Sequence, residues 1–212
     1  MMGSRSAKGR DAEPKPVWAT VLRTDEGYAA VAASGHGLVA CNWRHETEWA
    51  AVDGLREALT ALARRRGYAS AAWLAPGAGL PPHLAAARAG LVAYDRGQYD
   101  ALRGLVLDRR AHTPFTAAVM GRVQAIPAGQ VMSYGEVAVA AGRPGAARAV
   151  GQAMATNTLA PVVPCHRVIA AGGKIGGFGP GIAAKKRLLR REGVDFPNSF
   201  GDRVDKINNE AL

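Results

Sequence analysis

Cysteine is scarce in this sequence, and its scarcity excludes two classes of small protein. Only Cys41 and Cys165 occur among 212 residues, so a disulfide-rich scaffold is excluded. Neither lies in a CxxC pair and the histidines are scattered, so no spacing suits a zinc site. The two thiols could form one disulfide, but a reducing compartment keeps the thiols of a chain of this size free. We therefore expect no metal site.

Long apolar runs are also missing. Arg, Gly or Asp interrupts every alanine-rich stretch, whereas a membrane-spanning helix needs about 20 mostly apolar residues. Residues 1–15 are polar and lack the apolar core of a secretion signal, so we interpret them as a disordered leader. The expected location is the cytoplasm, with no membrane partner.

Acidic residues are absent from one long segment. Residues 143–191 contain many Arg and Lys but no Asp or Glu, and the formal net charge of the whole chain is +10. A basic balance favours a polyanionic partner, most often nucleic acid. An arginine-rich solvated surface explains the total charge equally well. The clustering of cations in one half of the chain favours the nucleic-acid interpretation.

The first half alternates short β-type runs with glycine-containing turns. This pattern predicts an antiparallel meander of strands over residues 17–23, 28–33 and 38–43. Thr47 then opens a helix that ends at three arginines before Gly67, an arrangement that the helix dipole favours. Residues 69–74 suggest a further strand and residues 83–91 a short helix.

The second half reads as helical. Thr113 and Pro114 cap a first helix, and Ser133 with Glu136 forms a capping box that opens a second. The predicted helices cover residues 115–125, 134–141 and 146–156. A helix, a short glycine turn and a helix give the helix-turn-helix outline, although any helical hairpin does the same.

The third predicted helix has few side chains with which to read bases. Apart from Arg148, one surface of it carries only small residues: Ala146, Ala147, Ala149, Gly151 and Ala153. A slim helix suits close approach to a DNA backbone or minor groove with one long side chain inserted. Small residues equally allow tight packing between helices, and the sequence leaves both interpretations open.

Together these elements predict an α+β fold in two parts. A leader over residues 1–15 precedes a small N-terminal α/β domain, residues 16–105, with an antiparallel sheet and a helix. A linker around residues 98–108 leads to a mainly helical C-terminal domain, residues 112–196, with the helix-turn-helix. Residues 197–212 form a tail.

One short motif carries most of the chemistry. Pro161 and Pro164 restrict the backbone, so Cys165 is expected at a stiff bend outside any helix. A thiol beside the imidazole of His166, followed by the glycine-rich residues 172–181, is a candidate nucleophile. A packed structural cysteine beside a surface histidine is the commoner meaning of such a pair. The surrounding pattern decides between them.

Six segments and one asparagine occur in an order that resembles a known family. They are Thr113-Pro114-Phe115, Ile126-Pro127-Ala128-Gly129, Ser133-Tyr134-Gly135, Ala147-Arg148-Ala149-Val150-Gly151, Asn157, Pro164-Cys165-His166-Arg167-Val168 and Leu188-Leu189-Arg190-Arg191-Glu192-Gly193. Together they resemble the O6-alkylguanine-DNA alkyltransferases, or methylated-DNA–protein-cysteine methyltransferases. The strong match covers residues 113–194, and the N-terminal half is similar only in element order.

The resemblance implies irreversible transfer of an alkyl group from O6-alkylguanine, and from O4-alkylthymine, in duplex DNA to Cys165. It implies that His166 and Glu192 form a proton relay, that Tyr134 helps to rotate the nucleotide out, and that Asn157 braces the turn. Tyr134 would also protonate the departing base. A thioether has no good leaving group, so the protein would act once, with no cofactor.

The resemblance also implies the binding residues. Arg148 would fill the gap that the flipped base leaves in the stack. The remaining DNA contacts would be Ser133, Tyr134, Ala147 and Gly151, and the base pocket would be lined by Pro164, Val168, Phe178 and Gly179. The partner would be double-stranded DNA, bound by a monomer that could act cooperatively.

Elementary chemistry is compatible with these roles. Neighbouring side chains on an extended backbone point to opposite sides, so Cys165 and His166 are expected to communicate through a water molecule. An acid is unfavourable near a helix C-terminus, so the position of Glu192 indicates a specific partner. Two other functions compete: a non-catalytic lesion sensor or helix-turn-helix regulator, and a cysteine hydrolase with repeated turnover.

Overall fold

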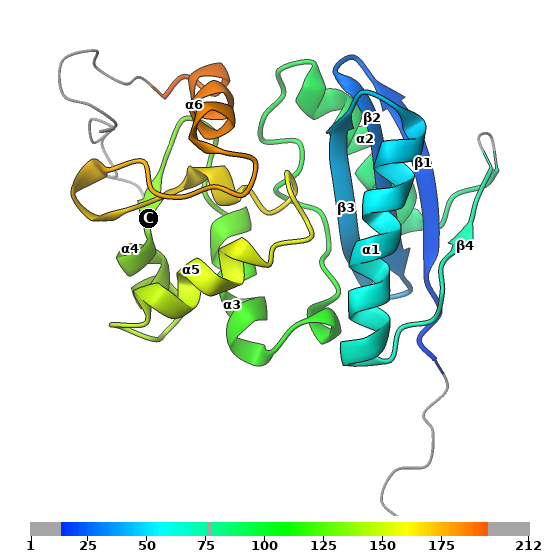
Figure 1. Ribbon diagram of the computed structural model, residues 1–212, viewed down its shortest axis with the longest axis horizontal. Helices are drawn as coiled ribbons and strands as arrows, with labels where there is room; N and C mark the ends of the chain where they lie inside the picture. The colour runs from blue at the N-terminus through cyan, green and yellow to red at the C-terminus, as the bar shows by residue number, and fades with distance from the viewer. Residues whose placement is uncertain (1–13, 76–77, 195–212) are drawn as a thin grey trace, which may run out of the picture.

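The computed structural model describes residues 14–75 and 78–194 (Figure 1). In the first half, β1 (Trp18–Thr24), β2 (Gly27–Ser34) and β3 (Gly37–His45) form the predicted antiparallel meander. The short β4 (Ala72–Trp73) pairs with β1 in parallel, so the predicted antiparallel arrangement holds for the first three strands and the four-stranded sheet is mixed. The helix between β3 and β4 carries the chain back across the sheet, which is the connection that parallel strands require.

Helices cover both faces of this sheet. Thr47 caps α1 (Glu48–Arg66) by accepting a hydrogen bond from the backbone of Ala50, and Gly67 ends it in the left-handed conformation, as predicted. On the opposite face, α2 (Pro82–Asp95) runs to residue 95, beyond the predicted end. Successive residues of β2 alternate between the two apolar clusters, and most of them are alanines, which lets both helices approach closely.

Four α-helices and a small strand pair make up the second half as far as residue 194. The helices are α3 (Pro114–Gln124), α4 (Tyr134–Ala140), α5 (Ala147–Ala155) and α6 (Ile182–Arg191). Single 3-10 turns lie at η1 (Arg109–Ala111), η2 (Cys165–Arg167) and η3 (Ala171–Gly173), and β5 (Met132–Ser133) pairs in parallel with β6 (Val168–Ile169). The predicted caps at Thr113 and Ser133 are both present, the latter as a complete capping box. Within the described ranges, no helix combines the length and apolar character that crossing a membrane requires.

The two halves pack against each other. The backbone of Leu38 in β3 donates to the carbonyl of Val106 (2.8 Å) and accepts from the amide of Asp108 (2.9 Å). Gly37, at a φ of +136°, makes this approach possible, because a Cβ there would lie 2.6 Å from the Val106 oxygen. One apolar cluster continues from Val31 and Leu91 to Val119 and Val163. The expected boundary near residues 104–112 is therefore a packed segment.

The ends of the expected domains fall partly outside the described residues. The leader over residues 1–13, residues 195–196 and the tail over residues 197–212 lie outside them. Lys15, which we assigned to the leader, belongs to the fold: its amide donates to the carbonyl of Gly67 (3.0 Å). The division into domains over residues 16–105 and 112–196 stays a prediction.

Candidate active site

The pairing of β5 with β6 assembles the site around Cys165. The turn η2 leads directly into β6, and β5 leads directly into α4, whose first residue is Tyr134. Because Met132 pairs with Val168, Tyr134 and Cys165 reach the same small cavity. Cys165 begins a 3-10 turn, so the expectation that it lies outside any helix is wrong. The amide of Arg167 donates to the carbonyl of Pro164 (2.8 Å) and closes this turn.

The cavity beside Cys165 has a volume of about 350 Å³, within the range of small-ligand sites. It is lined by Tyr134, Gly151, Met154, Ala155, Asn157, Ala160, Cys165, Gly177, Phe178, Gly179 and Pro180. Of the four residues that the resemblance implied for a base pocket, Phe178 and Gly179 line this cavity, but Pro164 and Val168 do not. Both are buried behind the turn, since the pairing of β6 with β5 takes Val168 into the core.

Asn157 holds the backbone before Cys165. Its side-chain amide donates to the carbonyl of Val163 (2.9 Å), and its side-chain oxygen accepts from the amide of Leu159 (2.9 Å). Burial raises the pKa of the half-buried Cys165 thiol, while a hydrogen bond with Asn157 and the charge of Lys185 act in the opposite direction. The thiol therefore needs a base to form the thiolate near neutral pH.

Lys185 is a member of the site that the sequence analysis missed. It is completely buried, and its Nζ donates to the carbonyl of Val168 (2.5 Å) and to that of Gly177 (3.3 Å). Burial lowers the pKa of Lys185 to about 8, and the charge of a Cys165 thiolate opposes this. Its spacing of three and four residues from Leu188 and Leu189 could have indicated a buried position.

His166 and Glu192 form a buried pair. His166 Nε2 lies 3.0 Å from Glu192 Oε1, and the two side chains are 2% and 1% exposed. Burial lowers the pKa of His166 more than the carboxylate raises it, so the ring is neutral near pH 7. Burial alone would raise the pKa of Glu192, but hydrogen bonds from His166 and Arg167 outweigh it and lower the value to about 2. An ionised carboxylate accepts a proton-bearing Nε2, which leaves Nδ1 free to act as a base.

Arg167 is a second missed residue. It is 2% exposed and donates to both oxygens of Glu192, from Nε to Oε2 (2.8 Å) and from a terminal nitrogen to Oε1 (2.9 Å). Its remaining donors reach the carbonyls of Ile126 (2.6 Å) and Tyr99 (3.1 Å). The guanidinium thus fixes the acid that orients His166, a contact that the sequence motif by itself does not reveal.

The thiol and the imidazole face different cavities. His166 borders a larger space of about 660 Å³ between β3, α1 and α6, which does not include Cys165. The two cavities share Asn157, Ala160, Phe178 and Pro180. Among the described hydrogen bonds, none joins the sulfur to the ring, which is compatible with the expected water bridge. The water bridge was expected because neighbouring side chains on an extended backbone point to opposite sides. The backbone here is instead a 3-10 turn, in which successive side chains point about 120° apart.

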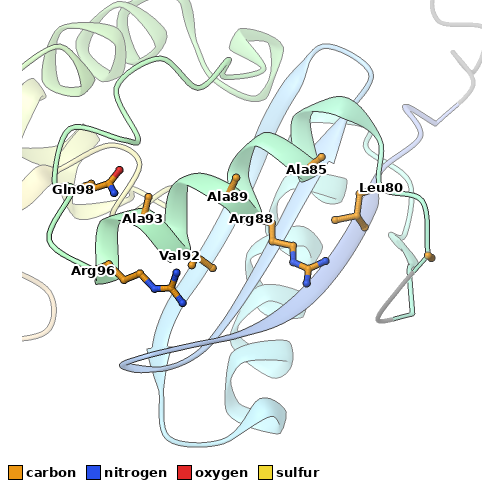
Figure 2. A pocket seen from close by; sticks show the side chains of 9 residues that line it. Leu80, Ala85, Arg88, Ala89, Val92, Ala93, Arg96 and Gln98 are labelled. Atoms are coloured by element: carbon orange, nitrogen blue, oxygen red, sulfur yellow. The ribbon is translucent and has the colours of Figure 1, made fainter.

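A further groove, of about 640 Å³, lies on the outer face of α2 (Figure 2). Its labelled side chains are mostly small or apolar, with the guanidinium groups of Arg88 and Arg96 beside them. No thiol, imidazole or carboxylate lines it, so this groove offers no comparable chemistry.

Two of the expected DNA-binding residues, Tyr134 and Gly151, line the smaller cavity. Arg148 is exposed on α5, and Gly151 and Ala155 follow it on the same face at helical spacing. Both of these line the cavity that contains Cys165. Ala147 is half-buried in the first turn of α5, and the Ser133 hydroxyl accepts the amide of Glu136 (3.2 Å) as a helix cap.

Comparisons with known proteins agree with these motifs. Residues 114–194 match the family model for the DNA-binding domain of 6-O-methylguanine DNA methyltransferase. A methylated-DNA–protein-cysteine methyltransferase of Salmonella typhimurium is 53% identical over 81 residues, which are 38% of this chain and 47% of that protein. The match thus spans about half the length of such curated relatives.

Solved structures extend the similarity to the N-terminal half. The crystal structure of the Mycobacterium tuberculosis O6-methylguanine methyltransferase is 33% identical, with a TM-score of 0.58, over 83% of this chain and 92% of that one. A structure of the M. tuberculosis protein in complex with DNA is also 33% identical, with a TM-score of 0.57, over 82% and 91% of the two chains. Because the alignment covers 92% of the mycobacterial chain at 33% identity, and the family model matches residues 114–194 around Cys165, this protein belongs to the O6-methylguanine-DNA methyltransferase family.

Proposed function

We propose that this protein repairs duplex DNA by moving the alkyl group of O6-alkylguanine, or of O4-alkylthymine, irreversibly to the sulfur of Cys165. The observation that carries the proposal is the position of Cys165 in a small cavity beside the exposed face of α5, with the His166–Glu192 pair behind it. The names of the relatives, and the DNA complex of the mycobacterial protein, support the same reaction class.

The reaction begins with proton removal from the thiol. A water molecule takes the Cys165 proton to Nδ1 of His166, while Glu192 stabilises the imidazolium through Nε2. The thiolate then attacks the alkyl carbon; the carbon–sulfur bond forms as the carbon–oxygen bond breaks, and the electron pair leaves with the base. Burial raises the pKa of the Tyr134 hydroxyl, which keeps it protonated as a donor to the departing base. The proton held by His166 replaces the one that Tyr134 gives up, so the net products are a thioether and an unmodified base.

DNA binds along α5 in this proposal. A stacked base cannot reach Cys165, so the alkylated nucleotide rotates out of the duplex into the cavity. Arg148 is exposed one turn before Gly151 and fills the space that the base leaves. The protein acts as a monomer, and the cytoplasm suits it because both cysteines are free.

Transfer from a duplex with one labelled O6-methylguanine tests the proposal. The wild type and a Cys41→Ser variant should both take up the label, because burial raises the pKa of the Cys41 thiol to about 12 and makes it inert. Cys165→Ser should take up none and still bind the duplex. DNA binding without transfer by the wild type would favour the lesion sensor, and release of the alkyl group over several turnovers would favour the hydrolase.

A further inference from the structure

Tyr94 brings a hydroxyl group from the N-terminal half into the buried relay. It lies in α2, is 1% exposed, and donates from Oη to Glu192 Oε1 at 2.9 Å across 98 residues of sequence. Burial and the nearby carboxylate raise the pKa of Tyr94, so the group remains a proton donor throughout the neutral range. Among the described residues of the C-terminal half, none donates a hydroxyl hydrogen bond to Glu192.

The ring of Tyr94 is fixed by its neighbours. Trp43 from β3 packs edge-on against it with ring centroids 5.3 Å apart, and Tyr99 does so at 5.5 Å. The indole of Trp43 also donates to Asp95, the next residue of α2, at 3.2 Å. A ring held on both sides in this way aims its hydroxyl in one direction.

Three donors meet at a single oxygen of Glu192. Tyr94 Oη (2.9 Å), His166 Nε2 (3.0 Å) and a terminal nitrogen of Arg167 (2.9 Å) all contact Oε1. Oε2 has one described donor, Nε of Arg167. The hydroxyl therefore acts on the same atom that orients the imidazole, and it can change the reaction without touching the DNA.

We propose that Tyr94 is a positioning residue for alkyl transfer: its hydroxyl holds Oε1 of Glu192 in the place that orients His166, so the N-terminal half completes the active site. This inference rests on the proposed function. Without the hydroxyl, Oε1 keeps two donors, the carboxylate turns more freely, and its charge is less well neutralised. The imidazolium then gains stability relative to the neutral ring.

The expected consequence is a pH effect. In the described part of the chain, the charged and titratable groups that act on Tyr94 and His166 are Arg167, Lys185, Glu192 and Arg191, together with the two groups themselves. Asp100 also lies 4.0 Å from Arg167. The substitution Tyr94→Phe removes one hydrogen-bond donor from this set and leaves the other groups in place. The pKa of His166 should rise, which shifts the acid limb of the transfer rate to higher pH. At neutral pH the rate constant should fall about tenfold, the smaller effect typical of residues that orient a reacting group through another.

Tyr68 supplies a matched control. It is 3% exposed, and its hydroxyl donates to the buried carboxylate of Asp108 at 2.9 Å. Neither Tyr68 nor Asp108 is among the described hydrogen-bond partners of Glu192. Single-turnover transfer from O6-methylguanine duplex should be measured from pH 5 to 9 for the wild type, Tyr94→Phe and Tyr68→Phe, below their melting temperatures. DNA affinity should be the same for the three proteins. Only Tyr94→Phe should show a slower transfer rate and an acid limb of the pH profile that is shifted to higher pH. Equal profiles for the two variants would overturn the inference.

A second readout separates this inference from the proposed function. Iodoacetamide modifies a reactive thiol without DNA, so its rate at Cys165 can be followed against pH in a Cys41→Ser background. A shifted profile for Tyr94→Phe supports the positioning role even if no alkyl group comes from DNA, an outcome that would reject only the proposed function. An unshifted iodoacetamide profile together with an unchanged transfer rate would reject the positioning role of Tyr94 and leave the proposed function intact.

Discussion

Replacing Glu192 by Gln should be among the most destabilising single changes in the chain. The carboxylate is 1% exposed and balances the charge of Arg167, which is 2% exposed. Gln keeps the shape and the acceptor oxygen but removes the buried anion beside Arg167, which keeps only a 4.0 Å contact with the exposed Asp100 among its described ion pairs. Removing one partner of a buried ion pair typically costs about 3–5 kcal/mol of folding free energy.

The linkage between proton binding and folding gives a similar magnitude for the contribution of the Glu192 carboxylate to stability. The pKa of Glu192 falls from 4.5 to about 2 on folding, and each unit corresponds to about 1.4 kcal/mol, so ionisation contributes about 3 kcal/mol at pH 7. Because the folded pKa is the lower one, this contribution is complete above the unfolded value of 4.5 and is lost as pH falls towards 2. Glu192→Gln has no such group and should lack this part of the acid dependence.

Urea unfolding followed by tryptophan fluorescence measures both effects. The free energy of unfolding at pH 7 should fall by about 3–5 kcal/mol for Glu192→Gln. It should change by less than about 0.5 kcal/mol for Glu57→Gln, a control at an exposed position of α1. Between pH 5 and 3, the wild type should lose more stability than Glu192→Gln. A loss below about 1 kcal/mol at pH 7, or parallel acid profiles, would refute this account of the pair.

Two further predictions concern DNA. Arg148→Ala should weaken repair of duplex by about 1–3 kcal/mol, the scale of one stacking contact, and leave the reaction with free O6-alkylguanine nearly unchanged; equal losses on both substrates would assign Arg148 to folding or chemistry. Affinity for duplex should fall steeply with salt and depend little on the sequence around the lesion, because residues 143–191 hold cations and no acid; a salt-independent Kd measured by fluorescence anisotropy would contradict this.

Local signals in the sequence were sufficient for most elements and for the family. The caps at Thr47, Thr113 and Ser133 depend on hydrogen bonds within four residues, so their patterns can be read directly. The pairing of β4 with β1 could not be read in this way. It depends on how α1 crosses the sheet, and two residues of strand carry little pattern of their own.

The composition of the site was less predictable than its location. Glu192 has partners at positions 94, 166 and 167, and only packing brings Tyr94 to it across 98 residues. Val168 was expected in the base pocket, but its strand pairing takes it into the core. Lys185 resembled one more cation of the basic segment, although its spacing from Leu188 and Leu189 indicates burial.

The most direct test of the central claim is the intact mass of the protein titrated with duplex DNA that contains one O6-methylguanine. The account predicts a gain of a single methyl group that rises with added DNA and stops at one per chain. After proteolysis, the methyl group should be found on the peptide with Pro164-Cys165-His166. An unchanged protein mass while the lesion is removed repeatedly, or a methyl group on Cys41 alone, would contradict the mechanism.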